Sequence, residues 1–187
     1  GDMSDVIAYF DMDCPFLFDS SGTLYMRYLW RQRQIRPQAI LRAYWYGALY
    51  KLRLFNYPTA MAKLTSAISE NSEAEMIAFC QRWFDVMVID YIAQKAVHRM
   101  DGHRAQGHRV VILSASTPYA VGPLARHLGV EDYLCTRLEV ASGRFTGRFI
   151  EPACYGDGKV YWAEWYGHAH DGDLADSYFY SDSHSDL

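Results

Sequence analysis

The sequence has few cysteines and no long apolar run, and each absence excludes a class of protein. Its four cysteines lie far apart and form no Cys-x-x-Cys pair, which argues against a zinc site and against a disulfide framework. No stretch approaches the roughly 18 consecutive apolar residues that a membrane span needs, and no basic segment precedes an apolar one near the N-terminus. We therefore expect a soluble, cytoplasmic protein with no membrane partner.

Long basic runs are also absent. The formal net charge is -4 and the Lys and Arg residues are spread along the chain, so no nucleic-acid partner is expected. Apolar and aromatic side chains, by contrast, are abundant, at 50% and 16% of the residues. In a chain of 187 residues this composition predicts one sizeable packed core, or a core with an inserted subdomain.

Two apolar runs end in side chains that are suited to chemistry. Val6 to Phe10 is followed by Asp11 and Asp13, the pattern of a buried strand that delivers carboxylates to the carboxyl edge of a sheet. On this stretch alone, a strand that simply ends in a polar turn is an equal alternative. The β-branched run from Arg109 to Ser114 leads into a loop of small residues and a predicted helix, which together form a ready anion site.

A further strand is predicted at Ser177 to Tyr180, and it runs into Asp182 and Asp186. Before it, Lys159 begins a helix that is rich in Trp and Tyr. Each residue also has a plainer explanation, with Lys159 as a solvated surface charge, Ser114 as a helix cap and the aspartates as a polar turn. These plainer explanations would all have to hold at once, so we favour one shared site over separate explanations.

Between the first strand and position 89 the sequence predicts only helices. This segment of about seventy residues has little glycine, no period-two alternation, and apolar residues three and four positions apart. Proline at positions 37 and 58 divides it, because the residue before a proline leaves the helical region. The predicted helices span 24–34, 37–53, 58–68, 72–89, 91–106, 119–128 and 159–168, and a β-hairpin is predicted at 136–149.

In this order and context the motifs resemble those of the haloacid dehalogenase superfamily, most closely its phosphoserine-phosphatase-like subfamily IB. The matching segments are Asp11-x-Asp13, Ser114-Ala-Ser-Thr-Pro, Leu128-Gly129, Thr136-Arg-Leu-Glu, Gly143-Arg-Phe-Thr-Gly, Tyr155-Gly-Asp-Gly-Lys159 and Tyr180-Ser-Asp-Ser-His-Ser-Asp-Leu187. The resemblance covers nearly the whole chain. It implies an α/β fold with a Rossmann-like parallel-sheet core at 1–16 and 90–187, and an inserted all-helical (C1-type) cap at 17–89.

The resemblance implies a phosphatase and a role for each motif. Asp11 is expected to be the nucleophile that forms an aspartyl-phosphate, and Asp13 the acid and base for the leaving group and the water. Ser114 and the neighbouring backbone at Ala115 are expected to hold the phosphoryl oxygens, and Lys159 to offset negative charge. The implied substrate is a small phosphorylated metabolite.

Several carboxylates that face a phosphate repel it, so the resemblance also implies a cation. Mg²⁺ is the expected cofactor, since it prefers oxygen ligands and bridges carboxylates to phosphates. Asp11, the backbone carbonyl of Asp13 and Asp182 match the family's metal ligands. Asp186 is expected to act through water or through Lys159.

Departures from the family pattern bear on activity and substrate. Pro15 stands where the first motif has threonine, which removes a hydroxyl and a backbone N–H. Ser20 stands where phosphoserine phosphatases have a glutamate for the ammonium group, which argues against phosphoserine. With Ser20, the adjacent Asp19 is a candidate for binding a cationic or hydroxylated substrate, although Asp19 to Ser21 also fits a helix cap. The sequence stops at Leu187, where the family continues, so we expect a piece of a longer protein.

The pattern leaves alternatives to a phosphatase. Pro15 is compatible with a catalytically impaired protein on the same fold that binds or regulates, and transfer to an acceptor other than water would use the same groups. A phosphoacceptor receiver module also gathers Asp, Ser or Thr, and Lys. Its compact fold, however, has no place for a long helical insertion after the first strand. The sequence does not indicate an oligomeric state.

Overall fold

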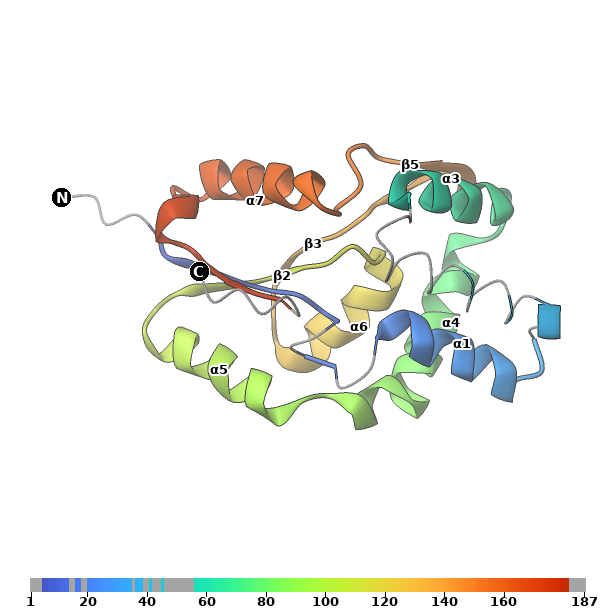
Figure 1. Cartoon of the computed structure of the whole chain (residues 1–187), viewed down its shortest axis with the longest axis horizontal. Coiled ribbons are helices and arrows are strands. Elements are labelled where there is room, and N and C mark those ends of the chain that lie inside the picture. Colours follow the sequence, from blue (N-terminus) through green and yellow to red (C-terminus); the bar gives the residue numbers. More distant parts are fainter. Residues whose placement is uncertain are drawn as a thin grey trace.

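The computed structural model describes residues 5–13, 16–17, 20–34, 36–38, 41, 45 and 56–181, and its centre is a parallel β-sheet (Figure 1). The strands follow the order β3-β2-β1-β6, so the strand that comes first in the sequence lies inside the sheet. They are β1 (Ile7–Phe10), β2 (Arg109–Leu113), β3 (Asp132–Leu134) and β6 (Tyr178–Tyr180). The α/β class with a parallel sheet, predicted from the sequence, is confirmed.

Helices cover both faces of this sheet (Figure 1). α7 (Asp157–Ala169) lies over one face, while α5 (Gln94–Ala105) and α6 (Pro118–Leu128) lie over the other. The other helices whose bounds the structure describes are α1 (Ser21–Arg31), α3 (Tyr57–Ala67), α4 (Glu73–Val86) and the 3-10 helices η1 (Val88–Tyr91) and η2 (Leu174–Asp176). None of the helices in the described ranges is long and apolar enough to cross a membrane.

Alternate side chains of β1 pack on opposite faces of the sheet, as the pleat of a strand requires. Ala8 and Phe10 belong to the larger core cluster, which includes buried side chains of α1, α4, α5 and α6. Ile7 and Tyr9 belong to a second cluster with Ala163 of α7. Because both faces are covered, β1 is apolar throughout, and the first polar side chain after it stands at the sheet edge.

The chain between β1 and β2 leaves the sheet and returns to it at the same place. Leu17 forms an isolated antiparallel bridge with Ile92, and the backbone N–H of Ala93 donates to the carbonyl of Phe16 at 2.6 Å. The chain before α1 therefore runs beside the chain before α5, close to the junctions expected at positions 16 and 90. The division into a core domain and a helical cap stays a prediction.

A two-stranded hairpin packs against this helical segment. Its strands, β4 (Leu138–Ala141) and β5 (Arg144–Phe149), are antiparallel, as the sequence predicts. The backbone of Phe145 exchanges hydrogen bonds with the turn between α3 and α4, donating to Asn71 at 3.0 Å and accepting from Glu70 at 2.8 Å. The hairpin and the α3–α4 turn are thus joined by backbone bonds of the kind found between strands.

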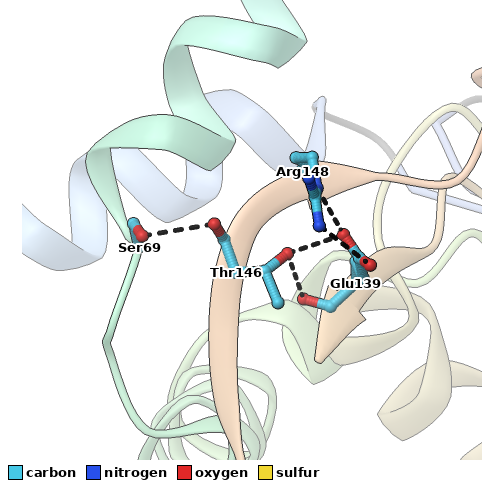
Figure 2. Close-up of polar contacts among 4 residues, drawn as sticks. All are labelled: Ser69, Glu139, Thr146 and Arg148. Atoms are coloured by element: carbon cyan, nitrogen blue, oxygen red, sulfur yellow. Dashed lines mark hydrogen bonds and ion pairs between the residues drawn. The ribbon is translucent and has the colours of Figure 1, made fainter. Parts of the chain in front are cut away.

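Side chains reinforce the same junction (Figure 2). The hydroxyl of Ser69, after α3, donates to the backbone carbonyl of Thr146 in β5 at 3.3 Å. On the hairpin itself, the carboxylate of Glu139 accepts from the Thr146 hydroxyl at 2.8 Å and from Arg148 Nε at 2.7 Å. These contacts brace β4 against β5 where the helical segment meets them.

Some element boundaries differ from the sequence prediction. β3 was not predicted, because three residues that begin with aspartate carry no alternating pattern. The helix expected from position 91 begins at Gln94, after η1, and the helix expected from Lys159 begins at Asp157. Most of the helix predicted over 37–53 lies outside the described residues.

Candidate active site

Asp11 and Lys159 form an ion pair at the carboxyl edge of the sheet. Asp11 directly follows β1, and its backbone N–H donates to the carbonyl of Tyr180 in β6 at 2.9 Å, which fixes the residue to the neighbouring strand. Lys159 Nζ lies 2.5 Å from Asp11 Oδ2. The two side chains are only 25% (Lys159) and 17% (Asp11) exposed, so the pair is partly shielded from water.

Two glycines place Lys159 in the first turn of α7. Gly156 has a φ of +54°, a conformation that a residue with a side chain rarely adopts. A Cβ added to Gly158 would lie 1.8 Å from the carbonyl oxygen of Ala153, so the helix start packs directly on the preceding loop. Gly156 therefore supplies the positive φ and Gly158 the close backbone packing, and together they direct Lys159 to the sheet edge.

Burial and the ammonium group of Lys159 shift the pKa of Asp11 in opposite directions. Burial raises the pKa of Asp11 above its usual value, and the nearby Asp13 carboxylate raises the pKa further. The charge of Lys159 and its hydrogen bond lower the pKa, as does the backbone N–H of Asp13. The net direction is upward, so Lys159 is the main group that favours the ionised form that a nucleophile needs.

Asp13 is held at the N-terminus of α1. One carboxylate oxygen accepts from the backbone N–H of Ser21 at 2.7 Å, and the other accepts from the Ser21 hydroxyl at 3.1 Å. Ser20 is the N-cap of α1 and accepts from the N–H of Thr23 at 3.2 Å, as the helix-cap interpretation predicts. The contact of Ser21 with Asp13 was not predicted from the sequence. Its only indication was that Ser20 and Ser21 resemble a helix cap.

Ser114 directly follows β2, beside the strand that delivers Asp11. Phe10 pairs with Ile112 across the two strands, so the polar residues that follow emerge at one edge. The Ser114 side chain is buried, and its backbone N–H donates to Leu134 at 2.8 Å. Ser114 Oγ accepts the backbone N–H of Ser116 at 3.1 Å, which leaves the hydroxyl hydrogen to donate elsewhere.

Two residues that sequence reasoning did not select hold the loop after Ser114. Thr136, which is fully buried, donates from its hydroxyl to the carbonyl of Ala115 at 3.1 Å and from its backbone to the carbonyl of Ser116 at 2.9 Å. The Thr136 hydroxyl also accepts from the N–H of Cys154 at 3.0 Å. The hydroxyl of Tyr57 in α3 donates to the same Ala115 carbonyl. The sequence signal for Thr136 was its place in the family-like segment Thr136-Arg-Leu-Glu, to which no role was assigned.

The remaining predicted site residues, Asp19, Asp182 and Asp186, lie outside the described residues, as does Pro15. Within the part of the chain that the structure describes, no three His, Cys, Asp or Glu side chains gather into a metal-binding group. Asp11 and Asp13 supply carboxylate and backbone carbonyl oxygens, the donors that Mg²⁺ takes in proteins. Their chemistry fits magnesium, and the third predicted ligand falls outside the described ranges.

Three of the four cysteines lie in the described residues, and all three are buried free thiols. Burial raises the pKa of Cys80 to about 11 and that of Cys135 and Cys154 to about 12. Thiols with such pKa values stay protonated near neutral pH and are poor nucleophiles. The observed link of Cys154 to the site is its backbone N–H, which donates to the Thr136 hydroxyl.

Comparisons with known proteins agree with this architecture. The model of the family described as "haloacid dehalogenase-like hydrolase" matches residues 8–187. A Mycobacterium tuberculosis protein named "Probable phosphatase" is 26% identical over 183 residues, which are 96% of this chain and 63% of that protein. The histidinol-phosphatase of Neisseria meningitidis serogroup C is 23% identical over 194 residues, covering 97% of this chain and 84% of the relative. The chain thus spans less than two thirds of the length of the first of these relatives.

Solved structures share the fold. A Bordetella pertussis Tohama I protein of unknown function superposes with a TM-score of 0.85 at 25% identity, covering 99% of this chain and 85% of its own. A phosphoserine phosphatase, solved as a phospho-aspartyl intermediate analogue, superposes with a TM-score of 0.64 at 14% identity, covering 95% of this chain and 78% of its own. The predicted resemblance is confirmed at the level of the family and the fold.

Proposed function

The chain belongs to the haloacid dehalogenase-like hydrolase family, and from this premise we propose that it is a Mg²⁺-dependent phosphatase that hydrolyses a small phosphomonoester through an aspartyl-phosphate. The observation that carries the proposal is the 2.5 Å contact between Asp11 and Lys159. A carboxylate at the end of a central strand, paired with an ammonium group from another element, is a nucleophile held beside its counter-charge. The relatives named as phosphatases support the same activity.

In the first half of the proposed reaction, a carboxylate oxygen of Asp11 forms a bond to phosphorus while the bond from phosphorus to the leaving oxygen breaks. Asp13 gives its proton to that oxygen, so the product leaves as a neutral alcohol. Ser114 donates its hydroxyl hydrogen to a phosphoryl oxygen, and Lys159 offsets the charge that builds up there. Ser21 keeps the Asp13 carboxyl group in position.

In the second half, a water oxygen attacks phosphorus and Asp13 takes the proton that the water loses. The bond between phosphorus and Asp11 breaks, which releases inorganic phosphate and restores the carboxylate. Asp11, the backbone carbonyl of Asp13 and Asp182 would hold Mg²⁺, which offsets the negative charge of the phosphoryl group when bound.

Substrate choice is the finer part of the proposal. Relatives of this chain include a histidinol-phosphatase and a Mycobacterium tuberculosis phosphoserine phosphatase. Ser20 caps α1 here, so this position offers no carboxylate for the ammonium group of phosphoserine. Histidinol phosphate also carries an ammonium group, so Ser20 does not favour it over phosphoserine, and a panel with both compounds measures their relative turnover directly.

The activity is tested with 4-nitrophenyl phosphate, with and without Mg²⁺, on the wild type and on Asp11→Asn. We expect kcat to fall at least about 10³-fold in the variant, because the amide cannot form the ester. Asp5→Asn is the matched control, since the Asp5 carboxylate is exposed and pairs only on the surface with Arg109 at 3.2 Å. Equal activity in Asp11→Asn and wild type would sink the assignment.

The same assay distinguishes the alternatives. A wild type that binds phosphate without turnover, and gains activity through Pro15→Thr, would favour an impaired binding protein. Phosphate that moves to an added alcohol instead of water would favour a phosphotransferase. The family assignment itself sets aside the receiver module.

A further inference from the structure

The carbonyl oxygen of Ala115 accepts hydrogen bonds from two side-chain hydroxyls that come from different parts of the chain. One is Thr136, which follows β3, and the other is Tyr57, in the first turn of α3. A carbonyl oxygen has two lone pairs, so two donors can hold it in a single orientation. The peptide group between Ala115 and Ser116 is therefore fixed from both sides.

That peptide group controls the Ser114 hydroxyl. It carries the N–H of Ser116, which donates to Ser114 Oγ at 3.1 Å. Rotation of the peptide would remove this donor, and the Ser114 hydroxyl could then turn freely. The two donors at Ala115 thus determine, through one peptide plane, where the Ser114 hydroxyl hydrogen points.

Tyr57 is well suited to be one of these donors. Burial raises the pKa of Tyr57 to about 12, so its hydroxyl keeps its proton near neutral pH. Its ring stacks on Tyr155, with the ring centroids 4.4 Å apart and the planes at 12°. Tyr155 lies in the loop that leads to Lys159, so Tyr57 contacts the chain on both sides of the site.

We propose that Tyr57 is a positioning residue through which the helical segment between β1 and β2 orients the Ser114 hydroxyl toward the phosphoryl group. The inference rests on the proposed phosphatase function. With the hydroxyls of Tyr57 and Thr136 both in place, the Ala115 carbonyl has two donors and Ser114 is ordered. Without the Tyr57 hydroxyl, Thr136 alone would hold this carbonyl, and Ser114 would lose part of its orientation.

Tyr57→Phe tests the proposal, because it keeps the ring that stacks on Tyr155 and removes only the hydroxyl. We expect kcat/KM for 4-nitrophenyl phosphate to fall about threefold to tenfold, the range for one hydrogen bond. The dissociation constant of inorganic phosphate in the presence of Mg²⁺, measured by calorimetry, should rise by a similar factor. Tyr161→Phe is the matched control, since Tyr161 is half exposed on α7, and both constants should stay unchanged.

A double-mutant cycle identifies the route of the effect. In a Ser114→Ala background, Tyr57→Phe should cause no further loss, because the hydroxyl that it positions is gone. An equal loss in both backgrounds overturns the proposal, as does a Tyr57→Phe protein with wild-type phosphate affinity. A merely structural role would lower the melting temperature and leave the constants of the folded protein unchanged.

Failure of the proposed function looks different. A wild type that binds phosphate without turnover contradicts the phosphatase, while the phosphate affinity of Tyr57→Phe still tests the positioning role. A wild type that binds no phosphate with Mg²⁺ contradicts both proposals.

Discussion

The strand ends and the helical segment between β1 and β2 contribute to the candidate site in different ways. The strand ends and the start of α7 supply the groups proposed to react or carry charge, namely Asp11, Ser114 and Lys159. The helical segment supplies Ser21 and Tyr57, whose contacts orient other site residues. Loss of a strand-end group should therefore remove a chemical function, whereas loss of a helical contact should only loosen the geometry.

Lys159→Met gives the largest effect expected in this comparison. It removes the ammonium group beside Asp11 and leaves a partly buried carboxylate without its counter-charge. We expect kcat to fall by about 10² to 10³, the loss typical of one electrostatic group in a site. Lys95→Met, at an exposed position of α5, should keep wild-type kcat. Similar losses in both variants would show that the charge at position 159 has no special role.

Gly158→Ala tests whether backbone packing places the lysine. The new Cβ would meet the Ala153 carbonyl at 1.8 Å, so α7 must shift. We expect the free energy of unfolding to fall by about 1–3 kcal/mol, with a loss of kcat as Lys159 moves. Gly102→Ala, in α5 with open space around it, should instead stabilise the protein by about 0.5–1 kcal/mol. Chemical unfolding measures both, and unchanged stability in Gly158→Ala contradicts the packing.

Ser21→Ala tests the helical side of the comparison. It removes one hydrogen bond to Asp13 and keeps the bond from the backbone N–H. We expect kcat to fall about threefold to tenfold, and more for an alkyl phosphate than for an aryl phosphate, because a poor leaving group depends more on the acid. Ser66→Ala, exposed on α3, is the control. An equal loss of kcat for alkyl and aryl phosphates would show that Ser21 does not act through the proton transfer proposed for Asp13.

The smallest effect is expected at α5, which supplies no predicted site residue. Burial lowers the pKa of His103, and the nearby His108 and Arg99 lower it further. A histidine with a lowered folded-state pKa contributes its stability in full above the unfolded value of 6.5, and this stability is lost as the pH falls below it. His103→Gln should flatten the pH dependence of unfolding between neutral and mildly acidic pH.

Much of the fold could be predicted from the sequence, because the patterns that indicate it lie within short segments. An apolar run followed by Asp11 and Asp13, a second run that ends at Ser114, and a lysine after Gly-x-Gly each occupy a few adjacent residues. The cap at Ser20 and the hairpin were equally local. The order of these motifs was sufficient to indicate the family and the α/β class, and both are confirmed.

Other features depend on residues that are distant in the sequence. Asp11 and Lys159 are 148 positions apart, and Tyr57 and Ala115 are 58 apart, so no local pattern predicts either contact. β3 has three residues and exists because β2 offers it a pairing edge. The sequence by itself determined which chemical groups are present and in which order. Only the tertiary structure decided which of these groups contact one another, because the contacts form when the strands align and the helices pack around them.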